Sequence, residues 1–246
     1  MRIAVISDMH ANCIGLDAVL ADLRAEPIDR LICLGDCIQG GPQPAEVVTR
    51  LRELGCLVVM GNADAWLLTG KETAAEPIPA ERLVKMSAIR EWSLAQLSIS
   101  DKRFMAAFQP TVEVPLGDRR NLLGFHGSPH SFDDIILPKT SEEDVQRMLG
   151  GFEPHILCGG HTHIQQIRHL GQSFYFGCGS AGFAWRHNQP EEQFRADPWA
   201  EYAVLTVDNG RTRVEFRRVP FDVEALITVY RASGRPHADE AIAQYQ

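Results

Sequence analysis

The sequence lacks the long apolar runs that membrane proteins need. Nowhere do about 18 apolar residues follow one another, which is the length of a membrane-spanning helix. The first apolar run, Ile3 to Ile6, is also far too short for a secretory signal peptide. We therefore expect no membrane partner and a cytoplasmic location.

The sequence also lacks closely spaced CxxC cysteine pairs and an excess of basic residues. The six cysteines include no CxxC pair and stand mostly inside or beside apolar runs, so we expect buried free thiols rather than disulfides. Lysine and arginine total 24 against 32 acidic residues, a formal net charge of −8. This balance argues against an extended nucleic-acid groove, which needs clustered basic side chains. A small phosphate ester stays compatible, because bound metals invert the local field.

The apolar runs of the first half predict alternating strands and helices. Runs at 3–6, 31–34 and 57–60 read as buried strands. Between the last two, a helical pattern begins at Pro44 and stops at Gly55. Such alternation predicts a parallel sheet whose strands all end at one edge.

The second half predicts further strands and two helical regions. Helical patterns cover about 79–108 and 141–149, and apolar runs predict strands at 112–116, 122–125 and 156–158 and hairpins at 164–176 and 202–219. We expect this half to form a mixed or antiparallel sheet. Together the two halves predict a single α/β domain over residues 1–246, a four-layer α-β-β-α sandwich of two mixed sheets flanked by helices. The polar stretch 182–198 is expected to be a loop that covers the site.

Side chains that ligate metals follow several of these apolar runs. They are Asp8 with His10, Asp36, Asn62, His126, and His161 with His163. Strand ends of this kind meet at one edge of a sheet, where open α/β folds bind their ligands. Nitrogen and oxygen donors without a thiolate favour Mn, Fe, Zn, Co or Ni over a structural zinc site. The pattern thus predicts two divalent transition-metal ions.

The charge of such a centre favours a phosphate ester. Two divalent ions beside Asp8 and Asp36 leave a charge of about +2, and a bridging hydroxide lowers it to about +1. Two ions can stabilise both the attacking and the leaving oxygen of an in-line displacement, with a metal-bridging hydroxide as the nucleophile. Asp36, Asn62 and His126 are the residues expected to hold the reacting groups.

The motifs resemble those of a known family. The series is Asp8-x-His10, Gly35-Asp36, Gly61-Asn62, His126-Gly127 and Gly160-His161-Thr162-His163. It is similar to that of the calcineurin-like metallophosphoesterase superfamily, in particular its compact bacterial and archaeal members. The resemblance implies one metal on Asp8, His10, Asp36 and His163, and a second on Asp36, Asn62, His126 and His161. Asp36 would bridge the two.

One position departs from the family pattern. Many members carry a histidine directly after the Gly-Asn pair, thought to protonate the leaving group, but this chain has Ala63 and then Asp64. We expect Asp64 to orient a metal ligand or the start of the following helix. His130 is the candidate for a substitute proton donor; the alternative is that it is an exposed loop histidine without a catalytic role. Arg186 is the candidate substrate contact; the alternative is that its loop only packs on its own aromatic residues.

These features predict a hydrolase for a phosphodiester or phosphomonoester. The substrate would be a small phosphate ester or a phosphopeptide. Protein phosphatase, cyclic-nucleotide phosphodiesterase and dinucleotide hydrolase activities all fit the same two-metal core. The alternative from another class is a non-catalytic metal-binding scaffold or protein-interaction module with this fold. A nuclease is disfavoured by the acidic balance, and the oligomeric state stays open.

Overall fold

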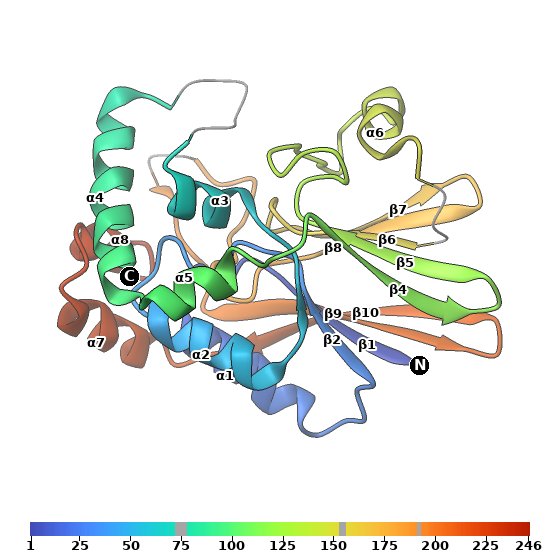
Figure 1. The fold of residues 1–246 in the computed structure, drawn as a ribbon, viewed down its shortest axis with the longest axis horizontal. Helices are drawn as coiled ribbons and strands as arrows, with labels where there is room; N and C mark the ends of the chain where they lie inside the picture. The colour runs from blue at the N-terminus through green and yellow to red at the C-terminus, as the bar shows by residue number, and fades with distance from the viewer. Residues whose placement is uncertain (72–77, 153–155, 191–192) are drawn as a thin grey trace.

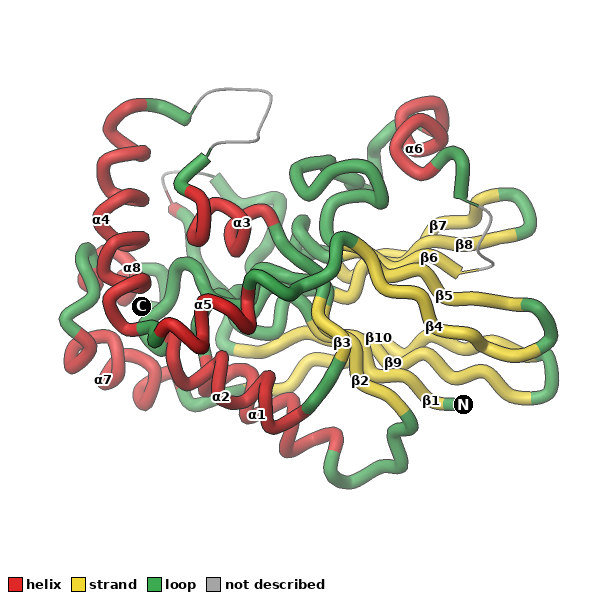
Figure 2. The backbone as a smooth tube through the Cα atoms, viewed as in Figure 1, coloured by secondary structure: helices red, strands yellow, loops and turns green. Residues whose placement is uncertain are grey.

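Two five-stranded sheets lie face to face, and helices cover their outer faces (Figure 1). The computed structural model describes residues 1–71, 78–152, 156–190 and 193–246. Figure 2 shows the strands of both sheets stacked on one side of the molecule, with most helices beyond one end of them. The arrangement confirms the predicted four-layer sandwich of two mixed sheets.

The first sheet is built around three parallel strands, as the sequence predicts. They are β1 (Arg2–Ile6), β2 (Arg30–Cys33) and β3 (Leu57–Val58). Helices α1 (Cys13–Leu23) and α2 (Pro44–Leu54) connect them. Asn12 caps α1 by accepting the main-chain N–H of Gly15 at 2.9 Å, and Gly55 ends α2 in a left-handed conformation with φ 56°.

The C-terminal hairpin completes this first sheet, which corrects one expectation. Strands β9 (Trp199–Asp208) and β10 (Arg211–Pro220) form the predicted hairpin. However, β9 pairs antiparallel with β1, and Arg2 lies opposite Thr206. The hairpin therefore does not join the sheet of the second half. An alternating pattern specifies a strand and its faces, but it does not specify which sheet edge the strand will join.

The second sheet is mixed and has the order β4-β5-β6-β8-β7. Its strands are β4 (Thr111–Gly117), β5 (Arg120–Phe125), β6 (Ile156–Gly159), β7 (Gln165–Leu170) and β8 (Ser173–Cys178). Strands β5, β6 and β8 are parallel, so β5 and β6 end at the same edge. Helix α6 (Glu142–Leu149) covers the outer face of this sheet.

Alternate side chains of β1 enter two different layers of the core. Ile3 and Val5 pack between the two sheets, while Ala4 and Ile6 pack between the first sheet and its helices. On the far side, Val145 of α6 packs against the second sheet. Burial of each large apolar side chain contributes about 1.5–3 kcal/mol. The central strands are thereby fixed in register, and so are the residues that follow them.

The remaining helices gather at the end of the sheets where β1 and β2 terminate (Figure 1). They are α3 (Asn62–Thr69), α4 (Ala80–Gln96), α5 (Ile99–Met105), α7 (Val223–Ser233) and α8 (Ala238–Ala243). The predicted helical region 79–108 is divided by a capping box at Ser98. Helices α4 and α8 lie side by side, joined by an ion pair of 3.2 Å between Lys85 and Glu240.

The structure bears on the expected lack of a membrane-spanning helix and on the expected free cysteines. None of the described helices is both long and apolar enough to cross a bilayer. All six cysteines lie within the described part of the chain and are free thiols, five of them buried and Cys56 half-buried.

Candidate metal centre

The candidate ligands converge from both sheets onto one edge. Asp8 and His10 follow β1, Asp36 follows β2, Asn62 begins α3, His126 follows β5, and His161 and His163 follow β6. They form two groups, Asp8 with His10 and His163, and Asp36 with His126 and His161. Within each group the ligating atoms lie within 4.8 Å of one another. Residues more than 150 positions apart are thus brought together at strand ends, as the pattern predicts. The ligands come from two sheets, however, and not from one edge of a single sheet.

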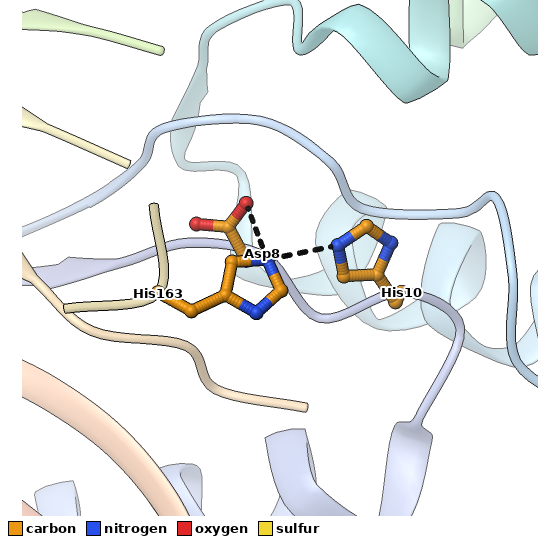
Figure 3. Close-up of side chains that lie close together, drawn as sticks. All are labelled: Asp8, His10 and His163. Atoms are coloured by element: carbon orange, nitrogen blue, oxygen red, sulfur yellow. Dashed lines mark hydrogen bonds and ion pairs between the residues drawn. The ribbon is translucent and has the colours of Figure 1, made fainter. Parts of the chain in front are cut away.

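The first group points three side chains at one small volume (Figure 3). The Nε2 atoms of His10 and His163 are 3.2 Å apart, and Asp8 Oδ1 lies 3.4 Å from His163 Nε2. Two nitrogen ligands at about 2.0–2.1 Å from a tetrahedral ion are separated by about 3.3 Å. The spacing of the two imidazoles therefore matches that of two ligands on one ion.

Asp36 lies between the two groups. Its Oδ2 is 3.4 Å from His126 Nε2 in the second group and 3.7 Å from His10 Nε2 in the first. The other oxygen, Oδ1, accepts the main-chain N–H of Ala63 at 2.8 Å. One oxygen is thus held by the backbone while the other faces both groups, which is the placement that a bridging carboxylate needs.

Asn62 and His161 complete the second group. Asn62 Oδ1 is 3.0 Å from His126 Nε2, so its neutral oxygen points at the same volume. The ring of His161 stands edge-on to that of His126, with 5.0 Å between the centroids. The main-chain N–H of His161 donates to Asp8 Oδ2 at 3.1 Å, which links the two groups.

Three main-chain carbonyl groups orient the imidazoles. The Nδ1–H of His10 donates to Gln39 O at 2.8 Å, that of His126 to Leu34 O at 2.7 Å, and that of His163 to Phe183 O at 2.6 Å. Since a carbonyl oxygen can only accept, each Nδ1 carries the proton. Each Nε2 is left to receive a proton or a metal ion, and this second-nitrogen hydrogen bond is typical of metal-bound histidine.

A buried carboxylate oxygen also lacks a hydrogen-bond donor. Asp8 is fully buried, and its Oδ1 has no hydrogen-bond partner among the described residues. Buried polar atoms without a partner are rare because they cost free energy. Together with the nitrogen and oxygen donors and the absence of a thiolate from the two groups, this atom fits a site for divalent transition-metal ions.

Charge interactions in the cluster are strong. Burial alone would raise the pKa of Asp36, but His126 outweighs it and lowers that pKa well below its usual range. Burial lowers the pKa of His126, and the neighbouring Asp36 carboxylate more than reverses this, to about 10. Burial and the charge of His126 lower the pKa of His161 to about 4. The carboxylate of Asp36 thus favours a positive charge beside it, whether on His126 or on a bound cation.

The ligand residues adopt unusual backbone conformations. Five of the seven have positive φ angles, namely Asp8 (56°), His10 (45°), Asp36 (50°), His161 (65°) and His163 (55°). Such conformations cost about 1–3 kcal/mol each and gather at functional sites, where surrounding contacts enforce them. Here Asp8 N–H donates to Gly35 O, and His10 N–H donates to Asp36 O, each at 2.9 Å. These bonds tie the loop after β1 to the loop after β2.

Two glycines make the close approach of these loops sterically feasible. A Cβ at Gly61 would lie 2.1 Å from Asp36 Oδ1. A Cβ at Gly35, which has φ 96°, would lie 2.6 Å from the main-chain nitrogen of Gly61. No side chain fits at either position, so the Gly-Asp and Gly-Asn pairs are steric requirements of the site.

Asp64 supports the loop that carries Asp36. Its buried carboxylate accepts the main-chain N–H of Cys37 at 3.0 and 3.1 Å and that of Ile38 at 3.1 Å. Burial and the charge of Asp36 raise the pKa of Asp64 to about 7. Asp64 thus supports the ligand Asp36 through the loop that carries it, and not through a direct bond to its side chain. At the preceding position, Ala63 contributes only its main-chain N–H.

His130 and Arg186 lie outside the two ligand groups. His130 Nε2–H donates to Gly150 O at 3.0 Å, and its ring is 5.1 Å from that of Phe152. Arg186 is exposed and has its Nε 3.7 Å from Asp197 Oδ1. It lines a cavity that His163 also borders.

Sequence reasoning missed the residues that act through hydrogen bonds to the main chain. Ser180 is fully buried, and its hydroxyl donates to Asp8 O at 2.7 Å and accepts the Phe183 N–H at 2.8 Å. It thereby holds the carbonyl of Phe183 near His163. A lone serine after a strand carries no pattern that would have identified it.

Residues 1–210 match the sequence profile of the calcineurin-like phosphoesterase superfamily domain. The chain belongs to this superfamily. The match confirms the resemblance seen in the ligand motifs. A curated relative, an uncharacterized protein of Methanocaldococcus jannaschii, is 48% identical over 71 residues, which is 29% of this chain and 29% of that protein. The matched part is thus less than a third of that relative.

Solved structures of similar proteins share the fold over nearly the whole length of this chain. A metallophosphoesterase from Sphaerobacter thermophilus is 24% identical with a TM-score of 0.73, and the match covers 99% of this chain and 98% of that one. A hypothetical protein from Pyrococcus horikoshii OT3 is 19% identical with a TM-score of 0.81, covering 100% and 98%. At these identities the likeness establishes the fold.

Proposed function

We propose that the protein is a dinuclear metal-dependent phosphoesterase that hydrolyses a phosphodiester or phosphomonoester by in-line displacement. Membership of the calcineurin-like phosphoesterase superfamily supports phosphoester chemistry. The observation that carries the proposal is the placement of Asp36 Oδ2, 3.4 Å from His126 Nε2 and 3.7 Å from His10 Nε2. A single oxygen that faces both groups favours two ions over one.

Each group has a distinct part in this proposal. Asp8, His10, Asp36 and His163 would hold one ion, and Asp36, Asn62, His126 and His161 the other. Two such ions supply an activated water and offset the charge of a phosphate. Asn62 and His126 lie beside the shared oxygen of Asp36 and would fix the orientation of the ester.

Two substrate contacts remain proposals from the sequence. His130 is the candidate proton donor for the leaving group, and its hydrogen bond to Gly150 O must open before the ring can turn toward a substrate. Arg186 is the candidate phosphate contact, from the segment 182–198 that we propose covers the substrate; residues 191 and 192 of that segment lie outside the described residues. Alanine substitution at each position, with kcat and KM measured on the same ester, tests both roles.

The substitution Asp36→Asn tests the proposed function directly. It keeps an oxygen for the Ala63 N–H but removes the negative charge shared by both groups. We expect metal-dependent hydrolysis of bis(4-nitrophenyl) phosphate and 4-nitrophenyl phosphate to fall at least about 100-fold, because ligand-sphere changes of this kind cost 10- to 100-fold or more. The matched control is Asp118→Asn, at an aspartate whose side chain is 84% exposed and which lies in the turn between β4 and β5, at the opposite end of β5 from His126.

The same measurements separate this function from the scaffold alternative. Metal content and hydrolysis are determined together, on the wild-type chain loaded with Mn²⁺. Two ions per chain with no hydrolysis across a broad ester panel would contradict the enzyme and favour a metal-binding scaffold. Hydrolysis that Asp36→Asn abolishes and Asp118→Asn retains would support the enzyme.

A further inference from the structure

A cavity of about 410 Å³ begins at the first ligand group and runs outward between α4 and the C-terminal helices. His10 and His163 border its inner end, and Gly40 and Gly41 border it beside them. Drug-sized and cofactor-sized ligands occupy pockets of about 300–1,000 Å³. The cavity therefore has room for the organic part of an ester whose phosphate lies at the ligand groups.

One wall of this cavity is aromatic. The ring of Phe183 stands edge-on to His10 and His163, with centroid distances of 6.2 and 6.0 Å. Tyr230 of α7 and Tyr245 after α8 extend the wall. Tyr245 is tied to the loop before Phe183 by its hydroxyl, 3.5 Å from Gly182 O. A planar group would find stacking and edge contacts here.

The outer part of the cavity is positively charged, although the protein as a whole has a net charge of −8. Among the described residues, Arg82, Lys85 and Arg235 line it together with a single acidic residue, Glu240. Glu240 pairs with Lys85 at 3.2 Å, while Arg82 is exposed and makes no ion pair within the described residues. The lining thus carries an excess of positive charge that favours an anion.

Arg235 has a structural part in this arrangement. Its guanidinium donates to Gly40 O at 2.5 Å and to Pro236 O at 2.8 Å. It therefore joins the end of α7 to the segment around Gly40, which follows Asp36. Both acceptors are main-chain carbonyl groups, so these bonds do not neutralise the charge of Arg235. Its charge adds to the field of the cavity, while Arg82, and Lys85 in exchange for Glu240, are the groups that can reach an anion.

We propose that this cavity binds the organic part of a phosphate ester that is planar and carries a second anionic group, the chemistry of a nucleotide with phosphates at two positions. One phosphate lies at the ligand groups, the planar part lies against Phe183 and Tyr230, and the second anion lies against Arg82 and Lys85. The inference rests on the proposed function for the place of the first phosphate. The aromatic wall and the cationic lining stand independently of it.

A neighbouring cavity of about 440 Å³ is a poorer match for such a ligand. It also borders His163, but its two arginines, Arg186 and Arg218, share it with the carboxylates Asp197 and Glu201. Arg218 Nε donates to Glu201 Oε1 at 2.8 Å, and Arg186 lies 3.7 Å from Asp197. Its charges are matched in number, so it attracts a second anionic group less than the first cavity does.

The experiment compares adenosine with adenosine 5′-monophosphate on the full chain in the presence of a chelator, by isothermal titration calorimetry. We expect the monophosphate to bind about tenfold more tightly, because its phosphate can accept charged hydrogen bonds that the nucleoside cannot. The double substitution Arg82→Gln with Lys85→Gln should remove this difference. Arg103→Gln, on the exposed surface of α5 and outside the cavity, is the matched control and should retain it.

A second measurement uses the Mn²⁺-loaded chain. Adenosine 3′,5′-bisphosphate should have a KM about tenfold lower than adenosine 5′-monophosphate, and the double variant should bring the two KM values together. Equal binding of adenosine and its monophosphate to the wild-type chain, or an unchanged difference in the double variant, would overturn the proposal even if aryl esters are hydrolysed. A chain that hydrolyses no ester but still shows the Arg82- and Lys85-dependent difference would support the cavity and contradict only the proposed function.

Discussion

Asp64 allows a quantitative test of how the loop after β2 is held in place. Its side chain is fully buried and accepts the main-chain N–H groups of Cys37 and Ile38 at 3.0–3.1 Å. The substitution Asp64→Ala leaves both buried N–H groups without an acceptor. Each such group costs about 1–3 kcal/mol. We therefore expect the free energy of unfolding to fall by about 2–6 kcal/mol.

The isosteric substitution Asp64→Asn separates hydrogen bonding from charge. Oδ1 alone accepts from both Cys37 and Ile38, each at 3.1 Å, so a single amide oxygen can satisfy both groups. Burial and the neighbouring Asp36 raise the pKa of Asp64 to about 7, which shows that its negative charge is unfavourable there. We expect asparagine to change the free energy of unfolding by no more than about 1 kcal/mol.

Thermal unfolding of the metal-free chain measures the difference. For a chain of this size each kcal/mol shifts Tm by about 2–4 °C, so alanine should lower Tm by about 4–24 °C and asparagine by no more than about 4 °C. The dissociation constant for Mn²⁺ should rise about 10- to 100-fold in the alanine variant, because the carrier loop of Asp36 is loosened. Equal Tm values for alanine and wild type, or equal losses for alanine and asparagine, would refute the hydrogen-bond role.

Two further predictions concern the ligand groups themselves. Burial lowers the pKa of both His126 and His163, but Asp36 raises the first to about 10 and Asp8 raises the second above its usual value. Metal loading at pH 7.5 should therefore release about one to two protons, and metal affinity should fall as the pH falls. Calorimetry in buffers of different ionisation enthalpy measures the number of protons released, and a result of zero would contradict the prediction. The substitution Gly61→Ala places a Cβ 2.1 Å from Asp36 Oδ1. It should weaken Mn²⁺ binding at least about tenfold with secondary structure retained by circular dichroism, and unchanged binding would contradict the steric argument.

The local sequence pattern was enough to predict the central strands and the ligand residues that follow them. Each central strand is a short buried run, and the residue types that follow it can ligate metal, so Asp8 and His126 could each be placed at a strand end from sequence. That these strands belong to two sheets whose ends meet is visible only in the structure. The partner of the hairpin 202–219 could not, because pairing with β1 depends on tertiary contacts. The helices after Pro220 were not predicted either, and they form one side of the cavity beside the first ligand group.

The orientation of the imidazoles shows where sequence reasoning stops. The acceptors that fix His10, His126 and His163 are main-chain carbonyls of Gln39, Leu34 and Phe183. Every residue has a carbonyl group, so no side-chain pattern distinguishes these three. They depend on the close approach of loops that the fold brings together. The ligand set is therefore readable from the sequence, while the protonation pattern that readies it for metal is visible only in the structure.

Ala63 and the cationic cavity bear on two different properties of the substrate. Position 63 serves the site through its main-chain N–H, which donates to Asp36 Oδ1 at 2.8 Å, and this contact requires no histidine side chain. Without a proton donor there, an ester is cleaved readily only if its leaving group tolerates negative charge. Arg82 and Lys85 line the cavity that adjoins His10 and would attract a second anionic group on the organic part of the substrate. The missing histidine therefore bears on the leaving oxygen, whereas the positive lining bears on the charge of the organic part.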